Sequence, residues 1–217
     1  MTPRTYSDEA VVLARRSFGE ADRILSLYSK HHGRLSLIAK GVRKPQSKKR
    51  GSLEVFSYIK FAAAKGRSLD IITEAETIDS FAQVRKNLRK VTVAYFFMEV
   101  IGRTTREAEK HQELFDLTIK YLNLLSREAL LKTLRANFVY EVITTLGFWP
   151  KGRPLINPDA QLEQIIERQL FSLRVGRKVL SLPSVLNSIY SCPISVYCLD
   201  ALLPPEFLLG LRLQHRE

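Results

Sequence analysis

Residues 40–51 of this chain read KGVRKPQSKKRG, a stretch in which six of the twelve side chains are cationic and none is acidic. Its two glycines and its proline favour a loop over a helix or a strand. Alternating runs flank it, RLSLIA at residues 34–39 and SLEVFSYI at residues 52–59. Alternation of apolar and polar residues is typical of half-buried strands. The stretch therefore predicts a basic loop held between two β-strands.

The rest of the N-terminal third continues this pattern of short strands and turns. Glycine turns follow Phe18, His32 and Lys65. Five short strands joined by such turns predict a small closed barrel of the OB type, with an SH3-like barrel as the alternative because periodicity alone does not separate the two. We expect strands at residues 9–14, 21–29, 34–39, 53–64 and 69–75.

From about residue 81 the apolar residues recur at intervals of three and four, which predicts helices. Gly147 is placed to end one helix, and Asn157 is placed to cap the next one, which begins at Pro158. The chain is therefore an α+β protein, with a barrel domain at residues 1–80 and an all-α domain at residues 81–217. We expect helices at residues 84–100, 107–125, 128–146 and 158–171, and two shorter ones at 184–190 and 195–202.

The positive charge of the chain is concentrated in one segment. The net charge over 217 residues is +12, and residues 30–67 hold eleven Lys and Arg against the single acid Glu54. A concentrated positive field attracts nucleic acids, because binding to phosphates releases condensed counterions. Anionic lipid is a weaker alternative, since neither an amphipathic helix nor an acyl anchor is visible near this segment. A solvated basic face without a partner is the plainest alternative.

Basic side chains that follow a nucleic-acid backbone and aromatic rings that stack on bases are the usual contacts of such a barrel. Tyr28, Phe56 and Tyr58 are the candidate stacking residues, although an aromatic residue on an alternating strand more often packs into the core. No recognition-helix or zinc-finger pattern indicates sequence-specific reading. The candidate phosphate contacts are Arg34, Lys40, Arg43, Lys44, Lys48, Lys49, Arg50, Lys65 and Arg67.

No catalytic or metal-binding pattern is present in the sequence. The adjacent His31 and His32 lack ligand spacing and are expected in a solvated turn. Cys192 and Cys198 form a single pair, which is a poor zinc site and no disulfide framework. Neither a phosphate-binding loop nor a nucleophile elbow occurs. We therefore expect no enzyme, no cofactor and no metal. Since the sequence shows neither a signal peptide nor a membrane helix, we expect a cytoplasmic protein.

Several motifs of this chain resemble the bacterial recombination mediator family RecO, and they agree with it in order and spacing over the first eighty residues. The helix-ending segment FVYEVITTLGFWP at residues 138–150 is similar to the family's helix that ends in Leu-Gly-Phe and a proline. The N-terminal motifs are EAVVL at residues 9–13, GEADRIL at 19–25, HGRL at 32–35, AKGVRKP at 39–45, Ser47, and GSLEVF at 51–56.

This resemblance implies an N-terminal OB-fold and a C-terminal helical domain. It implies binding of single- and double-stranded DNA, annealing of complementary strands, partnership with RecR and with single-stranded DNA-binding protein, and assistance in loading RecA. It thus implies that the protein acts at the nucleoid. Many members of the family carry a four-cysteine zinc finger after this helix, whereas no cysteine lies between Leu146 and Ser191 here. The C-terminal tail is also poorly matched to the family.

A second hypothesis places the main function in the helical region. There, apolar and basic residues would dock the acidic tail of single-stranded DNA-binding protein, with DNA binding secondary. Arg127, Lys132 and Arg135 are the candidate partner contacts within an apolar region. An ordinary helical core accounts for most of the same pattern, because an apolar helix stripe usually serves packing.

Overall fold

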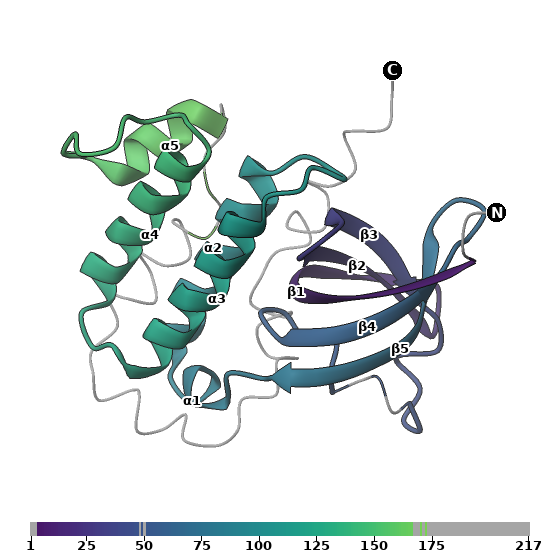
Figure 1. Cartoon of the computed structure of the whole chain (residues 1–217). Helices are drawn as coiled ribbons and strands as arrows, with labels where there is room; N and C mark the ends of the chain where they lie inside the picture. Colours follow the sequence, from purple (N-terminus) through teal and green to yellow (C-terminus); the bar gives the residue numbers. More distant parts are fainter. Residues whose placement is uncertain (1–3, 48, 50, 167–169, 171, 173–217) are drawn as a thin grey trace.

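The computed structural model describes residues 4–47, 49, 51–166, 170 and 172 of the chain. A five-stranded barrel is followed by a layer of helices that packs against one side of it (Figure 1). The strands are β1 (Thr5–Phe18), β2 (Asp22–Ser29), β3 (Gly33–Ala39), β4 (Tyr58–Ala64) and β5 (Asp70–Asp79). The helices are α1 (Ala82–Arg85), α2 (Leu88–Thr104), α3 (Gln112–Arg127), α4 (Leu131–Thr145) and α5 (Pro158–Ile166).

The strand order around the closed barrel is β1-β2-β3-β5-β4. The long strand β1 pairs with β4 through its first half and with β2 through its second half, and its register shifts between Val12 and Ala14. β3 pairs with β5 in parallel, through Leu37 with Asp70 and Ile38 with Ile71. This Greek-key order is that of the OB-fold, which confirms the predicted fold class over the SH3-like alternative.

Two hydrophobic cores hold the molecule together. The barrel interior contains Leu25, Leu37 and Phe61, and Val42 and Leu53 of the loop after β3 also pack into it. The second core lies between barrel and helices. Its barrel side consists of Val11, Leu13, Tyr28, Val55 and Phe56, and its helical side includes Phe96, Phe97, Phe115, Phe138 and Val142. The helices are therefore fixed to the barrel by continuous apolar packing.

Polar contacts also join the helical layer to the hairpin between β2 and β3. After α2 the backbone of Ala108 donates to the carbonyl of Arg34 at 3.1 Å, and Glu107 forms an isolated bridge with Arg34. A Cβ atom at Gly33, where φ is +69°, would lie 2.2 Å from the carbonyl oxygen of Glu109. The close approach of this connection thus requires glycine at position 33.

The strand expected at residues 9–14 is longer at both ends, as β1, and the one expected at 69–75 extends to Asp79, as β5. Three further differences have a local cause. The expected strand at 53–64 begins only at Tyr58, because residues 53–57 are turns in which Phe56 adopts a φ of +57°. The expected helix at 84–100 is divided into α1 and α2, because the side chain of Asn87 accepts from the backbone of Arg89 and caps a new helix. The helix expected at 107–125 is α3, which begins only at Gln112, because the chain before it pairs with the hairpin between β2 and β3.

Other boundaries follow the sequence signals. Gly147 follows α4 with a φ of +79°, as expected of a helix-ending glycine. Asn157 accepts from the backbone of Ala160 at 3.3 Å and caps α5. The expected boundary after residue 80 falls between β5 and α1, and the division into two domains stays a prediction. The expected helices at 184–190 and 195–202 lie outside the described residues, as do Cys192 and Cys198.

Candidate nucleic-acid interface

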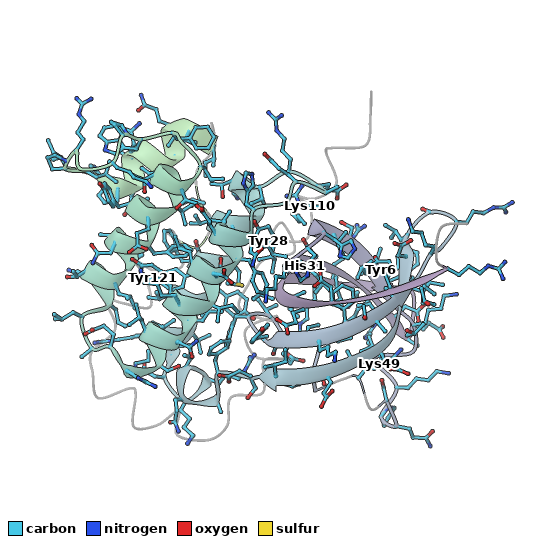
Figure 2. All side chains as sticks on the ribbon, in the orientation of Figure 1. Tyr6, Tyr28, His31, Lys49, Lys110 and Tyr121 are labelled. Atoms are coloured by element: carbon cyan, nitrogen blue, oxygen red, sulfur yellow. The ribbon has the colours of Figure 1, made fainter. Side chains whose placement is uncertain are left out.

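The loop after β3 begins with exposed basic side chains, on the side of the barrel away from the helices (Figure 1). Lys40, Arg43 and Lys44 are exposed. Lys49 is half-buried, and Figure 2 places it beneath β5 at the outer side of the barrel. Lys48 and Arg50 lie outside the described residues. We use the name basic end of the barrel for three segments: the described residues of the loop at 40–51, the turn at residues 19–21 and the β4–β5 loop at residues 65–69.

Hydrogen bonds fasten the start of this loop to the turn between β1 and β2. The backbone of Gly41 donates to Oδ1 of Asp22 at 2.7 Å. Arg43 donates through its backbone to the carbonyl of Ala21 at 2.9 Å and through its guanidinium to the carbonyl of Gly19 at 3.4 Å. The first basic residues of the loop therefore have a defined position relative to the barrel.

A hollow of about 430 Å³ separates the loop from the first half of β5. Lys49 reaches across one side of it, and its Nζ donates to the carbonyl of Ile72 at 3.0 Å. Lys44 lines the hollow with Lys49, and Glu74 of β5 also lines it. The full lining is Gly41, Lys44, Gln46, Ser47, Lys49, Thr73, Glu74 and Ala75.

The β4–β5 loop adds further cations to the basic end. Lys65 and Arg67 are both exposed. The loop is held by Asp70, whose Oδ1 accepts from the backbone of Gly66 at 3.0 Å, and by a bond of 2.9 Å from the backbone of Lys65 to the carbonyl of Arg4. Within the described part of the chain, Lys40, Lys44, Lys65 and Arg67 form no ion pair. Their charges remain available to an anionic ligand.

Arg34 does not belong to the basic end. Its guanidinium donates to the carbonyl of Gly102 near the end of α2, and its backbone pairs with the connection that follows α2. The position of Arg34 between barrel and helices gives it a structural contact, and its predicted role toward nucleic acid gains no support.

The burial of the predicted stacking residues corrects that part of the sequence interpretation. Tyr28 and Phe56 are 0% and 1% exposed, so neither ring offers a face to a base. The guanidinium of Arg85 lies 3.9 Å from the ring centre of Phe56, and Tyr28 packs in the core beneath the helices (Figure 2). Tyr58 is half-buried, with its hydroxyl donating to Glu9 at 2.6 Å and its ring against Phe115. All three rings serve the junction between barrel and helices.

Glu54, the single acid of the basic segment, does not neutralise the exposed cations. Its carboxylate pairs with Arg15 and lies 3.8 Å from the guanidinium of Arg23. The side chains of these arginines are only 4% and 8% exposed. The negative charge of Glu54 thus balances buried charges of β1 and β2 and leaves the field of the basic end intact.

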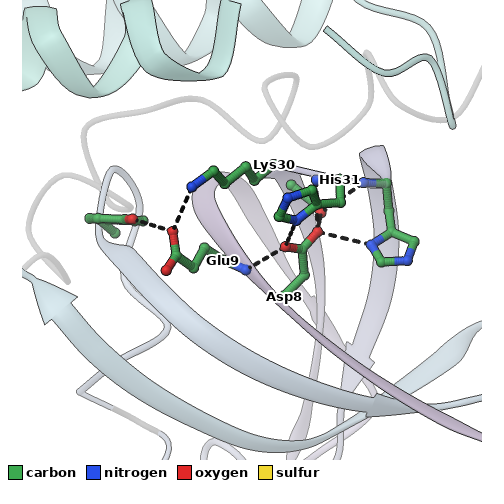
Figure 3. Close-up of polar contacts among 7 residues, drawn as sticks. Asp8, Glu9, Lys30 and His31 are labelled. Carbon is green, nitrogen blue, oxygen red and sulfur yellow. Dashed lines mark hydrogen bonds and ion pairs between the residues drawn. The ribbon is translucent and has the colours of Figure 1, made fainter. Parts of the chain in front are cut away.

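A buried carboxylate organises the turn between β2 and β3 (Figure 3). Asp8 accepts from the hydroxyl of Ser29 and from Nδ1 of His31 and of His32, at 2.7 and 2.9 Å for the two imidazoles. Burial alone would raise the pKa of Asp8, but these hydrogen bonds outweigh it and hold the pKa well below its ordinary value. The sequence interpretation of His31 and His32 as a solvated turn missed this cluster, because their partner is over twenty residues away in β1.

The predicted partner contacts are spread over the outer helices. Arg127 and Lys132 are exposed at the connection between α3 and α4, where Leu124 and Leu130 are 40% and 68% exposed. Arg135 is half-buried, pairs with Asp159 of α5, and lies 5.0 Å from the ring centre of Phe96. The structure thus brings together two of the three residues and gives the third a packing contact.

Neither a metal site nor a membrane span is found among the residues that the structure describes. No group of three His, Cys, Asp or Glu side chains is arranged there to hold a metal ion. Over the same residues, no helix has the length and apolar character needed to cross a membrane.

Comparison with known proteins places both parts of the chain in one group. Residues 1–81 match the family model described as Recombination protein O N terminal, and residues 85–153 match the one described as Recombination protein O C terminal. Over 147 residues the chain is 36% identical to the DNA repair protein RecO of Pelotomaculum thermopropionicum. The aligned region covers 68% of this chain and 57% of that protein.

Two further relatives show the same similarity. The DNA repair protein RecO of Desulfitobacterium hafniense is 32% identical over 175 residues, or 79% of this chain and 62% of that protein. That of Dehalococcoides mccartyi is 28% identical over 200 residues, or 92% of this chain and 78% of that protein. The chain spans 57% and 62% of the lengths of the Pelotomaculum and Desulfitobacterium proteins.

Proposed function

The chain belongs to the RecO family of DNA repair proteins, and from this premise we propose that it binds single- and double-stranded DNA through the basic end of its barrel, without sequence specificity. We further propose that it anneals complementary strands and, with RecR, helps to load the recombinase RecA. It performs this work at the nucleoid in the cytoplasm. It acts by binding and needs no catalytic step.

One observation carries the proposal: the exposed cations of the basic end lack carboxylate partners within the described part of the chain. Lys40, Lys44, Lys65 and Arg67 are exposed and form no ion pair there. Nearby Glu54 is engaged with Arg15. Unpaired surface cations gain free energy from phosphates, because their binding releases counterions from the nucleic acid.

Annealing follows from the same electrostatics. Two complementary strands repel each other through their phosphates, and this repulsion opposes their encounter. A protein that neutralises several phosphates lowers the repulsion, and base pairing then supplies the driving force. Because the protein contacts backbone phosphates rather than base edges, it accepts any sequence.

The test replaces the four unpaired cations with alanine and measures affinity for a labelled single strand and for a duplex across a salt series. The affinity of the parent should fall steeply with salt, and the slope for single strands should become less steep by about 3 in the quadruple variant. Strand annealing should slow in parallel. A matched control variant replaces Lys86, Lys110, Lys132 and Lys151, which are exposed cations on the helical part, and thus removes the same net charge.

Comparing the basic-end variant with the control variant distinguishes a DNA site at the basic end from attraction by the net charge of the protein. If the control variant loses as much affinity and as much salt dependence as the basic-end variant, net charge alone explains the binding and the assignment to the basic end is wrong. If the parent binds neither form of DNA, the whole proposal fails.

A second candidate function rests on the exposed apolar residues beside Arg127 and Lys132. Leu124 and Leu130 lie at the same connection, so an acidic tail with apolar residues would find both kinds of contact there. We propose that the tail of single-stranded DNA-binding protein docks on this connection. Titration of the full chain with the tail peptide tests it: Leu130→Ala with Lys132→Ala should weaken binding, and an undiminished affinity would exclude the connection as the docking site.

A further inference from the structure

Among the described residues of the barrel, Phe18 is the aromatic residue whose side chain is exposed. It is the last residue of β1, and its side chain is 51% exposed, whereas Tyr28 and Phe56 are buried. Neither of the two hydrophobic cores includes it. A single exposed apolar residue is common on protein surfaces and means little by itself. Its neighbours decide whether the ring is placed for a ligand.

Phe18 directly precedes the turn of the basic end that is hydrogen-bonded to the basic loop. Phe18 pairs in register with Asp22 across the turn, and Gly19 takes a φ of +61° to close it. The turn is bonded to the basic loop through the backbone of Gly41 and through Arg43. Hydrogen bonds therefore connect the turn that follows Phe18 to the start of the cationic loop.

Cations occupy the same face of the sheet as the ring. In a strand, residues two positions apart lie on one face, so Phe18 and Arg16 share the outer face of β1, while Arg15 points inward to Glu54. Arg23 of β2 pairs with Ala39 of β3. Asp22 comes just before Arg23 and Lys40 just after Ala39, so Asp22 and Lys40 lie next to each other beyond this pair. The order across the sheet is thus an aromatic ring, an acid bonded to the loop backbone, and an exposed lysine.

We propose that an unpaired base of single-stranded nucleic acid stacks on Phe18 while its flanking phosphates contact Arg16, Lys40 and Arg43. This inference rests on the proposed function and adds the element that distinguishes strands from duplexes. The bases of a duplex are stacked on one another and paired, so they offer no free face to the ring. Phosphates are common to both forms. Phe18 therefore strengthens binding to single strands only.

The test compares Phe18→Ala, Phe18→Leu and Phe18→Trp with the parent, using a labelled oligonucleotide as a single strand and as the corresponding duplex. Loss of base stacking should weaken single-strand affinity of Phe18→Ala by about 5- to 150-fold. Its duplex affinity and its salt slope should not change, because no phosphate contact is removed. Phe18→Trp should bind single strands at least as tightly as the parent, and Phe18→Leu should bind them weakly.

Control variants and the alternative outcomes keep the inference separate from the proposed function. Phe148→Ala removes an aromatic residue of similar exposure, 52%, from the helical part and should leave both affinities unchanged. The stacking inference is wrong if Phe18→Ala binds single strands within about twofold of the parent, if Phe18→Leu matches the parent, or if duplex affinity falls equally. Each of these outcomes leaves the binding by cations intact, which the quadruple lysine and arginine variant measures independently.

Discussion

The imidazole of His31 lies 2.7 Å from the carboxylate of Asp8, with Nδ1 facing the acid. An ionised carboxylate only accepts hydrogen bonds, so the imidazole carries its proton on Nδ1. Asp8 is 7% exposed, and it also accepts from the backbone of His31, so a buried carboxylate holds the turn that leads into β3.

Replacing Asp8 with asparagine should destabilise the fold at neutral pH by about 2 kcal/mol, because several donors lose their charged acceptor. The folded-state pKa of Asp8 is lowered, so its stabilising contribution is present above the unfolded pKa and is lost as the pH falls below about 4. Urea unfolding from neutral to acidic pH should show the gap between parent and variant narrowing. Asp116→Asn, at an exposed position of α3, serves as the control, and a gap that widens toward low pH contradicts the assignment.

Gly33→Ala should lower stability more than Gly147→Ala. Both glycines have positive φ, at +69° and +79°, and each alanine meets the left-handed penalty of about 1–2 kcal/mol. Only at Gly33 would the added Cβ also meet the backbone of Glu109, at 2.2 Å, while the space around Gly147 is open to 4 Å. Thermal unfolding measures the stability of both variants. Equal losses of stability would show that the backbone near Glu109 shifts to accommodate the added Cβ at no cost in free energy.

Glu54→Gln should destabilise the protein by about 3 kcal/mol, because the variant loses the ion pair between this carboxylate and the buried guanidinium of Arg15. Glu74→Gln, at an exposed position of β5, should change stability by less than about 0.5 kcal/mol. Denaturant unfolding distinguishes the two. Should Glu54→Gln prove as stable as the parent, the acid would not be the counter-charge of Arg15.

Arg135→Ala should loosen α5 while Lys132→Ala should not. Arg135 joins α4 to Asp159 of α5 and covers the ring of Phe96, whereas Lys132 is exposed. Hydrogen exchange of the amides of α5 should accelerate in the first variant alone. Unchanged exchange rates of the α5 amides in Arg135→Ala would show that Arg135 does not hold α5, and it would then stay a candidate partner contact.

The N-terminal elements were largely predictable from local signals. Alternation located the strands and glycines located the turns, and together they predicted a small barrel of the OB or SH3-like type, of which the strand order confirms the OB type. The largest miss was the start of β4, placed at residue 53 rather than Tyr58, while both ends of β1 and the end of β5 were predicted too short. Residues 53–57 have a strand-like pattern, but Leu53 is required inside the barrel and Phe56 beneath the helices, and the chain turns to supply both.

What the sequence determined by itself is the order of strands and helices and the concentration of positive charge in residues 30–67, because both follow from the types and spacing of neighbouring residues. Only the tertiary structure decided which side chains face solvent. A two-residue period assigns alternate residues to opposite faces but does not show which face another layer covers. The helices cover Tyr28 and leave Phe18 exposed, and the fold brings Glu54 to Arg15 and Asp8 to His31. Such contacts join residues distant in the chain, so no local pattern records them.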